Sequence, residues 1–89
     1  MINRDLEKKK LEDKGHKNIV EVSWPQNHIN EKHSHPWDAE IIVLYGNIKV
    51  MVENKEYLLK PGDEFKLKAD IEHSEFVGDE GVTFLSVKP

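Results

Sequence analysis

Short segments in which apolar and polar residues alternate make up most of this chain, and no other feature of the sequence constrains the fold as strongly. In the first of them, Val20, Val22 and Trp24 share one face, while Glu21 and Ser23 share the other. This period of two is typical of a β-strand with one buried face. Further candidate strands follow at close spacing, around residues 33–35, 48–52, 57–59, 65–69, 73–77 and 82–87, and residues 40–45 form a continuous apolar run that predicts a buried strand. Seven or eight short strands of this kind predict an all-β fold, a small barrel or jelly roll of antiparallel strands.

Turn-forming residues separate these segments. Pro61–Gly62–Asp63 is a strong turn signal, and Gly46–Asn47 and the Gly-Asp-Glu-Gly segment at residues 78–81 are predicted as further turns. Ahead of the first strand, residues 1–16 carry mixed charges and few apolar side chains. We expect them to form a short N-terminal arm, either frayed or folded as one short helix, and we expect residues 17–89 to form the barrel domain.

The composition limits the chemistry that the chain can carry. It has 89 residues, which suffices for one domain with a small core, and no cysteine, which excludes disulfides and thiolate metal sites. Positive and negative residues are well mixed at a formal net charge of −4, so nothing indicates a nucleic-acid surface. The longest apolar run, Ile41–Tyr45, is too short to cross a bilayer, and the charged N-terminus is unlike a signal peptide. We therefore expect a cytoplasmic protein that binds neither membrane nor nucleic acid.

Three histidines are candidate metal ligands. His33 and His35 are two residues apart, so in an extended segment their imidazoles lie on the same face. His73 comes after further strands and a turn, where an antiparallel neighbour could present it to the same point. The acidic residues Asp38 and Glu40 follow the histidine pair directly. Three neutral imidazoles and one carboxylate would bind a divalent iron, manganese, nickel or zinc ion and leave coordination positions open for substrate or water.

The spacing of these residues resembles the two motifs of the cupin superfamily. The first motif reads G-x5-H-x-H-x3,4-E-x6-G, and residues 27–46 match it at both histidines, at a glutamate and at the last glycine. The second motif reads P-x-G-x2-H-x3-N, of which this chain keeps His73 but not the proline, glycine or asparagine. The segment Leu59–Asp63 resembles a turn that cupins carry between the motifs. This resemblance, over roughly residues 20–89, implies a small cupin-type barrel with the three histidines bound to a metal inside it.

The carboxylate ligand is left open between two residues. Counted forward from His35, Glu40 occupies the glutamate position of the motif. Counted back from Gly46, that position falls on Ala39, and Glu40 would then point to the other face of the strand. Asp38, beside the histidine pair, is the competing candidate.

The remaining residues near the motifs are interpreted more simply. Trp37 either forms a wall of the barrel mouth or caps the core, and both interpretations stay open. His16 and His28 lie outside the predicted strands, so we expect both on the surface.

Two classes of function follow from the resemblance. The first is a metal-binding cupin that binds a small molecule at its histidine-coordinated ion. The alternative is a cupin metalloenzyme, similar to the dioxygenases or isomerases, that acts on a small oxygenated substrate. A deep cavity beyond the metal would favour catalysis, and a cavity closed by Trp37 would favour a structural site. A homodimer is expected because the core is small, with a partner surface in residues 1–24 that includes the apolar residues Leu6, Leu11, Val20 and Val22.

Overall fold

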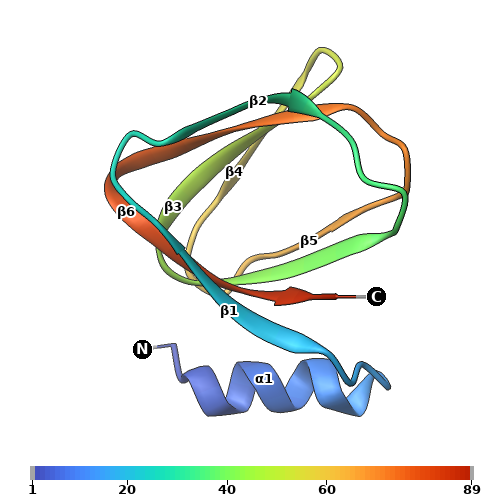
Figure 1. The fold of residues 1–89 in the computed structure, drawn as a ribbon. Coiled ribbons are helices and arrows are strands. Elements are labelled where there is room, and N and C mark those ends of the chain that lie inside the picture. The colour runs from blue at the N-terminus through green and yellow to red at the C-terminus, as the bar shows by residue number, and fades with distance from the viewer. Residues whose placement is uncertain (1, 89) are drawn as a thin grey trace.

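The computed structural model describes residues 2–88, which form one helix and six strands. In chain order these are α1 (Arg4–Asp13), β1 (Ile19–Trp24), β2 (Ile29–His33), β3 (Ala39–Val52), β4 (Lys55–Leu59), β5 (Glu64–Leu67) and β6 (His73–Val87). All strand pairs are antiparallel and belong to one sheet. Figure 1 shows how this sheet curves back on itself. The predicted antiparallel all-β barrel is therefore confirmed.

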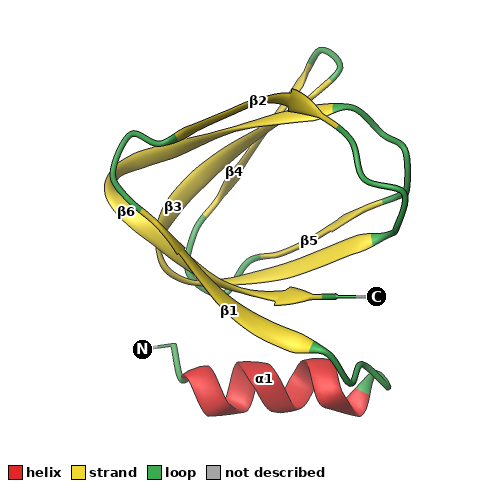
Figure 2. Cartoon of the chain, in the orientation of Figure 1, coloured by secondary structure: helices red, strands yellow, loops and turns green. Residues whose placement is uncertain are grey.

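The long strands β3 and β6 connect the two walls of the barrel. They pair with each other along most of their length. The first wall contains the end of β3 and the start of β6, with β4 paired to β3 on one side and β2 paired to β6 on the other. The second wall contains the start of β3 and the end of β6, with β5 paired to β3 and β1 paired to β6. The strands of these two walls face each other around the interior in Figure 2.

Glycines mark the corner between the two walls. The turns predicted at Gly46–Asn47 and at residues 78–81 are wrong, because both segments lie within the continuous strands β3 and β6. The register of this strand pair shifts twice near the corner, an irregularity that bends strands. Gly46 has a φ of 74°, and a Cβ at this position would overlap the carbonyl oxygen of Gly81. Two pairs of predicted short strands therefore merge into two long bent ones, which gives six strands rather than seven or eight.

The main apolar core lies between the walls. Its buried members come from β3, β4 and β6, and they are Val43, Ile48, Val50, Leu59, Val77, Val82 and Phe84. Partly buried side chains from β1 and β5 pack against this cluster, among them Trp24 and Phe65. The ring of Trp24 meets that of Phe84 edge-on, with centroids 5.0 Å apart.

Helix α1 covers the outside of one wall (Figure 1). Asn3 caps its first turn by accepting a hydrogen bond from the backbone N–H of Leu6 at 3.2 Å. Leu11 is fully buried in a second apolar cluster with Ile42 of β3 and Leu85 of β6. The N-terminal arm thus contains a helix that packs on the outer face of the sheet through the apolar side chain of Leu11.

This packing reduces the partner surface expected in residues 1–24. Leu11 is buried by the chain itself, and Val22 lines the interior cavity. Leu6 and Val20 remain exposed, at 60% and 40% of their surface. Within residues 2–88, no helix has the length and apolar character needed to span a membrane.

Candidate metal centre

The structure brings His33, His35 and His73 together at one end of the barrel interior. His33 is the last residue of β2 and pairs in register with His73, the first residue of β6. His35 lies in the loop that leads to β3, and its carbonyl oxygen accepts a hydrogen bond from the backbone N–H of Asp70 at 2.7 Å. One ring nitrogen from each histidine lies within 4.8 Å of the corresponding nitrogens of the other two. The β2–β6 pairing thus positions two imidazoles, and a tethered loop positions the third.

Backbone carbonyl groups set the tautomers of two of these histidines. Nδ1 of His33 lies 2.6 Å from the carbonyl oxygen of Glu31, and Nδ1 of His73 lies 3.0 Å from that of Ile71. A carbonyl oxygen can only accept, so each Nδ1 carries the hydrogen, and in the neutral ring Nε2 keeps its lone pair. Such a contact is the usual way in which proteins orient a metal-binding histidine.

His35 is held in its neutral form by its surroundings. Burial lowers its pKa below the ordinary 6.5, and the positive charges that His73 and His33 carry when protonated lower it further. The ring also stacks on Trp37, with centroids 5.0 Å apart and planes 14° from parallel. Because a metal ion binds neutral imidazole, this environment favours the ligating form.

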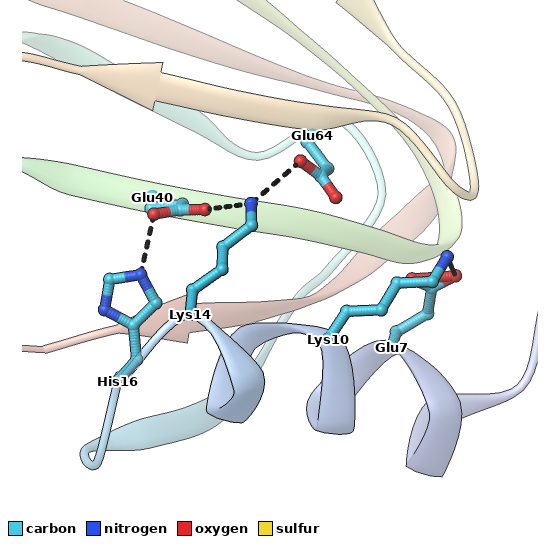
Figure 3. A network of polar contacts seen from close by, with 6 residues as sticks. All are labelled: Glu7, Lys10, Lys14, His16, Glu40 and Glu64. Carbon is cyan, nitrogen blue, oxygen red and sulfur yellow. Dashed lines mark hydrogen bonds and ion pairs between the residues drawn. The ribbon is translucent and has the colours of Figure 1, made fainter.

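Neither acidic residue singled out in the sequence reaches the histidines. Glu40 points to the outer face of the sheet, where its carboxylate contacts Lys14 and His16 at 2.9 Å each (Figure 3). Asp38 is exposed and accepts a hydrogen bond from the backbone N–H of Ala69. Ala39 instead lines the cavity, so counting back from Gly46 gives the correct orientation of this strand.

The surface position expected for His16 and His28 also needs correction. Both are half-buried. Nε2 of His16 contacts the carboxylate of Glu40 under helix α1. Nε2 of His28 lies 2.9 Å from Oδ1 of Asn30, and its ring lies 5.6 Å from that of Trp24.

A different carboxylate, Glu75, lies beside one of the three histidines, His33. Its Oε1 is 3.5 Å from Nε2 of His33 and accepts a hydrogen bond from Nδ2 of Asn30 at 3.2 Å. The side chain is only 14% exposed and lines the cavity. The sequence analysis missed it, although a signal was present: Glu75 follows His73 by two residues and therefore shares its strand face.

The histidines open onto a cavity of about 670 Å³ between the two walls. Most of its lining is apolar or aromatic, with contributions from Val22, Trp24, Ile41, Phe65 and Phe84. Ser86 and Lys88 add polar groups, and Trp37 lines the cavity beside His35. Cavities of this size and character are typical of small-molecule sites.

The donor set fits a first-row divalent metal ion. Imidazole nitrogens suit iron, nickel and zinc, and three ligands from the chain leave positions open toward the cavity. With metal–nitrogen bonds of about 2.1 Å, two ligands of one ion lie roughly 3.0–3.4 Å apart. The nitrogens already lie within 4.8 Å of one another, so the cluster could hold such an ion after small side-chain rotations.

Comparisons with known proteins agree on the fold. The structure resembles a cupin-2 domain protein from Shewanella frigidimarina with a TM-score of 0.70 and 18% identity, covering 80% of this chain and 68% of that one. A conserved protein of unknown function from Streptococcus pyogenes matches with a TM-score of 0.69 and 26% identity, covering 80% of this chain and 63% of that one. A variant of oxalate decarboxylase from Bacillus subtilis matches with a TM-score of 0.68 and 23% identity, covering 78% of this chain but only 20% of that one. The chain thus spans about two thirds or less of these proteins.

The sequence comparison identifies the family. No curated protein matches the chain. The family model of the cupin domain matches residues 20–88, a range that includes all six strands except the first residue of β1. The chain therefore belongs to the cupin family.

Proposed function

We propose that this protein binds one divalent metal ion through His33, His35 and His73, and that a small molecule binds at this ion inside the barrel. One observation carries the proposal. Hydrogen bonds to backbone carbonyl groups fix Nδ1 of His33 and His73 as donors, which leaves Nε2 of each ring free to bind a metal beside a cavity of about 670 Å³.

The cavity residues suggest how a small molecule would be held. A bound divalent ion would act as a Lewis acid toward an oxygen atom of the ligand. The aromatic and aliphatic side chains of both walls would contact its apolar part and exclude water. The hydroxyl group of Ser86 and the ammonium group of Lys88 would offer polar contacts at the edge.

The second candidate is a cupin metalloenzyme, similar to the dioxygenases or isomerases, with a small oxygenated substrate. The extent of the cavity favours it: Trp37 stacks on His35 and forms part of the lining, and the space continues to Phe65 and Phe84 on the opposite wall. Turnover of a cavity-sized ligand by the metal-loaded protein would distinguish this enzyme from a binding protein.

Metal binding is tested by calorimetry on demetallated protein with nickel, zinc, manganese and, under anaerobic conditions, iron(II). We expect one ion per chain for at least one of these metals. His73→Ala should lose most of the binding, because it removes one of three nitrogen ligands from a site without thiolates. His16→Ala is the matched control, since this imidazole lies on the outer face with Glu40. No saturable binding, or equal binding by His73→Ala, would refute the proposal.

A further inference from the structure

Glu75 and His33 present two hydrogen-bond acceptors to each other. Because Nδ1 of His33 donates to the carbonyl oxygen of Glu31, the neutral ring has a bare lone pair at Nε2. Oε1 of Glu75 lies 3.5 Å from this nitrogen. A lone pair and a carboxylate oxygen repel at this separation unless a positive charge lies between them.

The separation itself suits a shared metal ion better than a direct hydrogen bond. A hydrogen bond between a ring nitrogen and a carboxylate is shorter, at roughly 2.7–2.9 Å. Two ligands of one ion with bonds of about 2.1 Å lie roughly 3.0–3.4 Å apart. The observed 3.5 Å between Nε2 of His33 and Oε1 of Glu75 is close to that range.

The surroundings of Glu75 hold its carboxylate in place but do not neutralise it. Nδ2 of Asn30 donates to Oε1, and the side chain is 14% exposed. Within residues 2–88, no lysine or arginine forms an ion pair with Glu75. A carboxylate that is mostly covered and has no lysine or arginine partner is a suitable ligand for a cation. A divalent ion held by the three histidines would supply that charge.

We infer that Glu75 is the carboxylate ligand of the metal and that Asn30 is a positioning residue that orients it. The inference rests on the proposed metal binding. It moves the carboxylate from β3, where the cupin motif has its glutamate, to β6, two residues after His73. Ala39, which lines the cavity at the β3 position counted back from Gly46, has no ligating group.

The candidate ligands and the apolar lining residues lie on different sides of the cavity. Glu75 and His73 lie on β6, His33 on the neighbouring β2, and His35 in the loop that follows it. The facing strands β3 and β5 contribute Ala39, Ile41, Phe65 and Leu67 to the lining, none of which can bind a metal. A bound ion would therefore have its protein ligands on the β2–β6 side, and the apolar β3–β5 side would be free to contact a small molecule.

The test compares metal affinity among variants of the full chain. Glu75→Gln keeps the shape of the side chain and removes the charge, and it should bind manganese or nickel at least ~10-fold more weakly than the unmodified protein. Asn30→Ala should lose less metal affinity than Glu75→Gln. Adding Ala39→Glu to Glu75→Gln returns a carboxylate to the cavity from the β3 side and should recover affinity. Glu40→Gln is the matched control, because that carboxylate lies on the outer face, and its affinity should be unchanged.

Two further measurements separate the possible failures. The visible spectrum of bound cobalt(II) should change in Glu75→Gln, because a neutral amide replaces the anionic carboxylate donor. If the unmodified protein binds no metal, the proposed function itself fails. If it binds metal and Glu75→Gln matches its affinity and spectrum, the assignment of Glu75 is overturned. If Glu75→Gln is unfolded by circular dichroism without metal, Asn30→Ala decides, and an affinity equal to that of the unmodified protein would overturn the assignment.

Discussion

Nζ of Lys14, at the C-terminal cap of helix α1, lies 2.9 Å from Oε2 of Glu40 in β3 (Figure 3). The other carboxylate oxygen of Glu40 lies 2.9 Å from Nε2 of His16, and Lys14 also reaches Glu64 of β5 at 3.2 Å. Together with buried Leu11, these contacts attach the N-terminal helix to the outer face of the barrel. The glutamate that one count of the cupin motif would make a metal ligand therefore has a structural role here.

Removing the charge of Glu40 should destabilise the fold without affecting metal binding. Glu40→Gln leaves Lys14 without its closest partner at a position where Glu40 is 7% exposed. We expect a loss of about 1–3 kcal/mol in the free energy of unfolding, measured by urea denaturation. Glu64→Gln is the control, because this half-exposed ion pair should contribute less than ~1 kcal/mol. Equal losses for the two variants would contradict the role given to Glu40.

The same contact predicts how stability depends on acid. Burial raises the pKa of Glu40, but the hydrogen bond and charge of Lys14, with Lys66 and His16, outweigh burial and lower it below the ordinary 4.5. A carboxyl group whose pKa is lower in the folded state contributes stability above its unfolded value, and this is lost as pH falls through the folded value. Denaturation curves of the unmodified protein and Glu40→Gln should therefore differ at neutral pH and converge as pH falls below the ordinary 4.5. A constant difference would contradict this.

Local sequence spacing was enough to predict the fold class and to place His33 and His35 on one face. The alternation along each strand follows from the pleat, and His33 and His35 are close in the chain. His73 meets them because its strand pairs with the one that ends at His33. The cupin resemblance supplied this long-range pairing, which periodicity alone does not specify.

The features that the sequence analysis missed depend on contacts between distant residues. The role of Glu40 depends on Lys14, which lies 26 positions away and reaches it only because helix α1 packs on the sheet. The segment at Gly46 has the composition of a turn, and only its pairing with β6 makes it a bend in a long strand. Glu75 was within reach of a period-two argument applied to β6, but it falls at a position that the second family motif leaves unspecified.

Substituting the corner glycine should cost much more than substituting another glycine of similar backbone conformation. Gly46 and Gly15 have φ values of 74° and 96°, so alanine is strained at both. At Gly15 a Cβ meets nothing within 4 Å, whereas at Gly46 it overlaps the backbone of Gly81. Gly15→Ala should lose about 1 kcal/mol and Gly46→Ala at least ~3 kcal/mol, measured by thermal unfolding. Similar losses of stability in the two variants would show that β3 and β6 can move apart at the corner to accommodate a Cβ.

The homodimer expected from the sequence remains a prediction, and the structure suggests where to test it. In the part of the chain that the structure describes, β1, β2, β4 and β5 each pair on one side only, and unpaired edges favour association. Leu58 of β4 is 66% exposed, and Leu6 of α1 is 60% exposed. Sedimentation velocity at tens of micromolar should show a dimer that Leu58→Lys or Leu6→Lys weakens, and the more sensitive substitution identifies the partner surface. A monomer in the unmodified protein would contradict the prediction.

Metal affinity should fall as the solution becomes acidic, because protons compete with the metal for the imidazoles. The pKa of an unperturbed histidine is about 6.5, so the apparent metal affinity should drop steeply below that pH. The lowered pKa of His35, caused by burial and by the charges of His73 and His33, keeps this ligand neutral further into acid. His35→Ala should therefore weaken binding even at about pH 6, where its ring would still have been available. Calorimetry between about pH 7.5 and about pH 5 measures both effects, with His16→Ala as the control. An affinity that does not change over this range would show that the ion is held by groups other than the histidines.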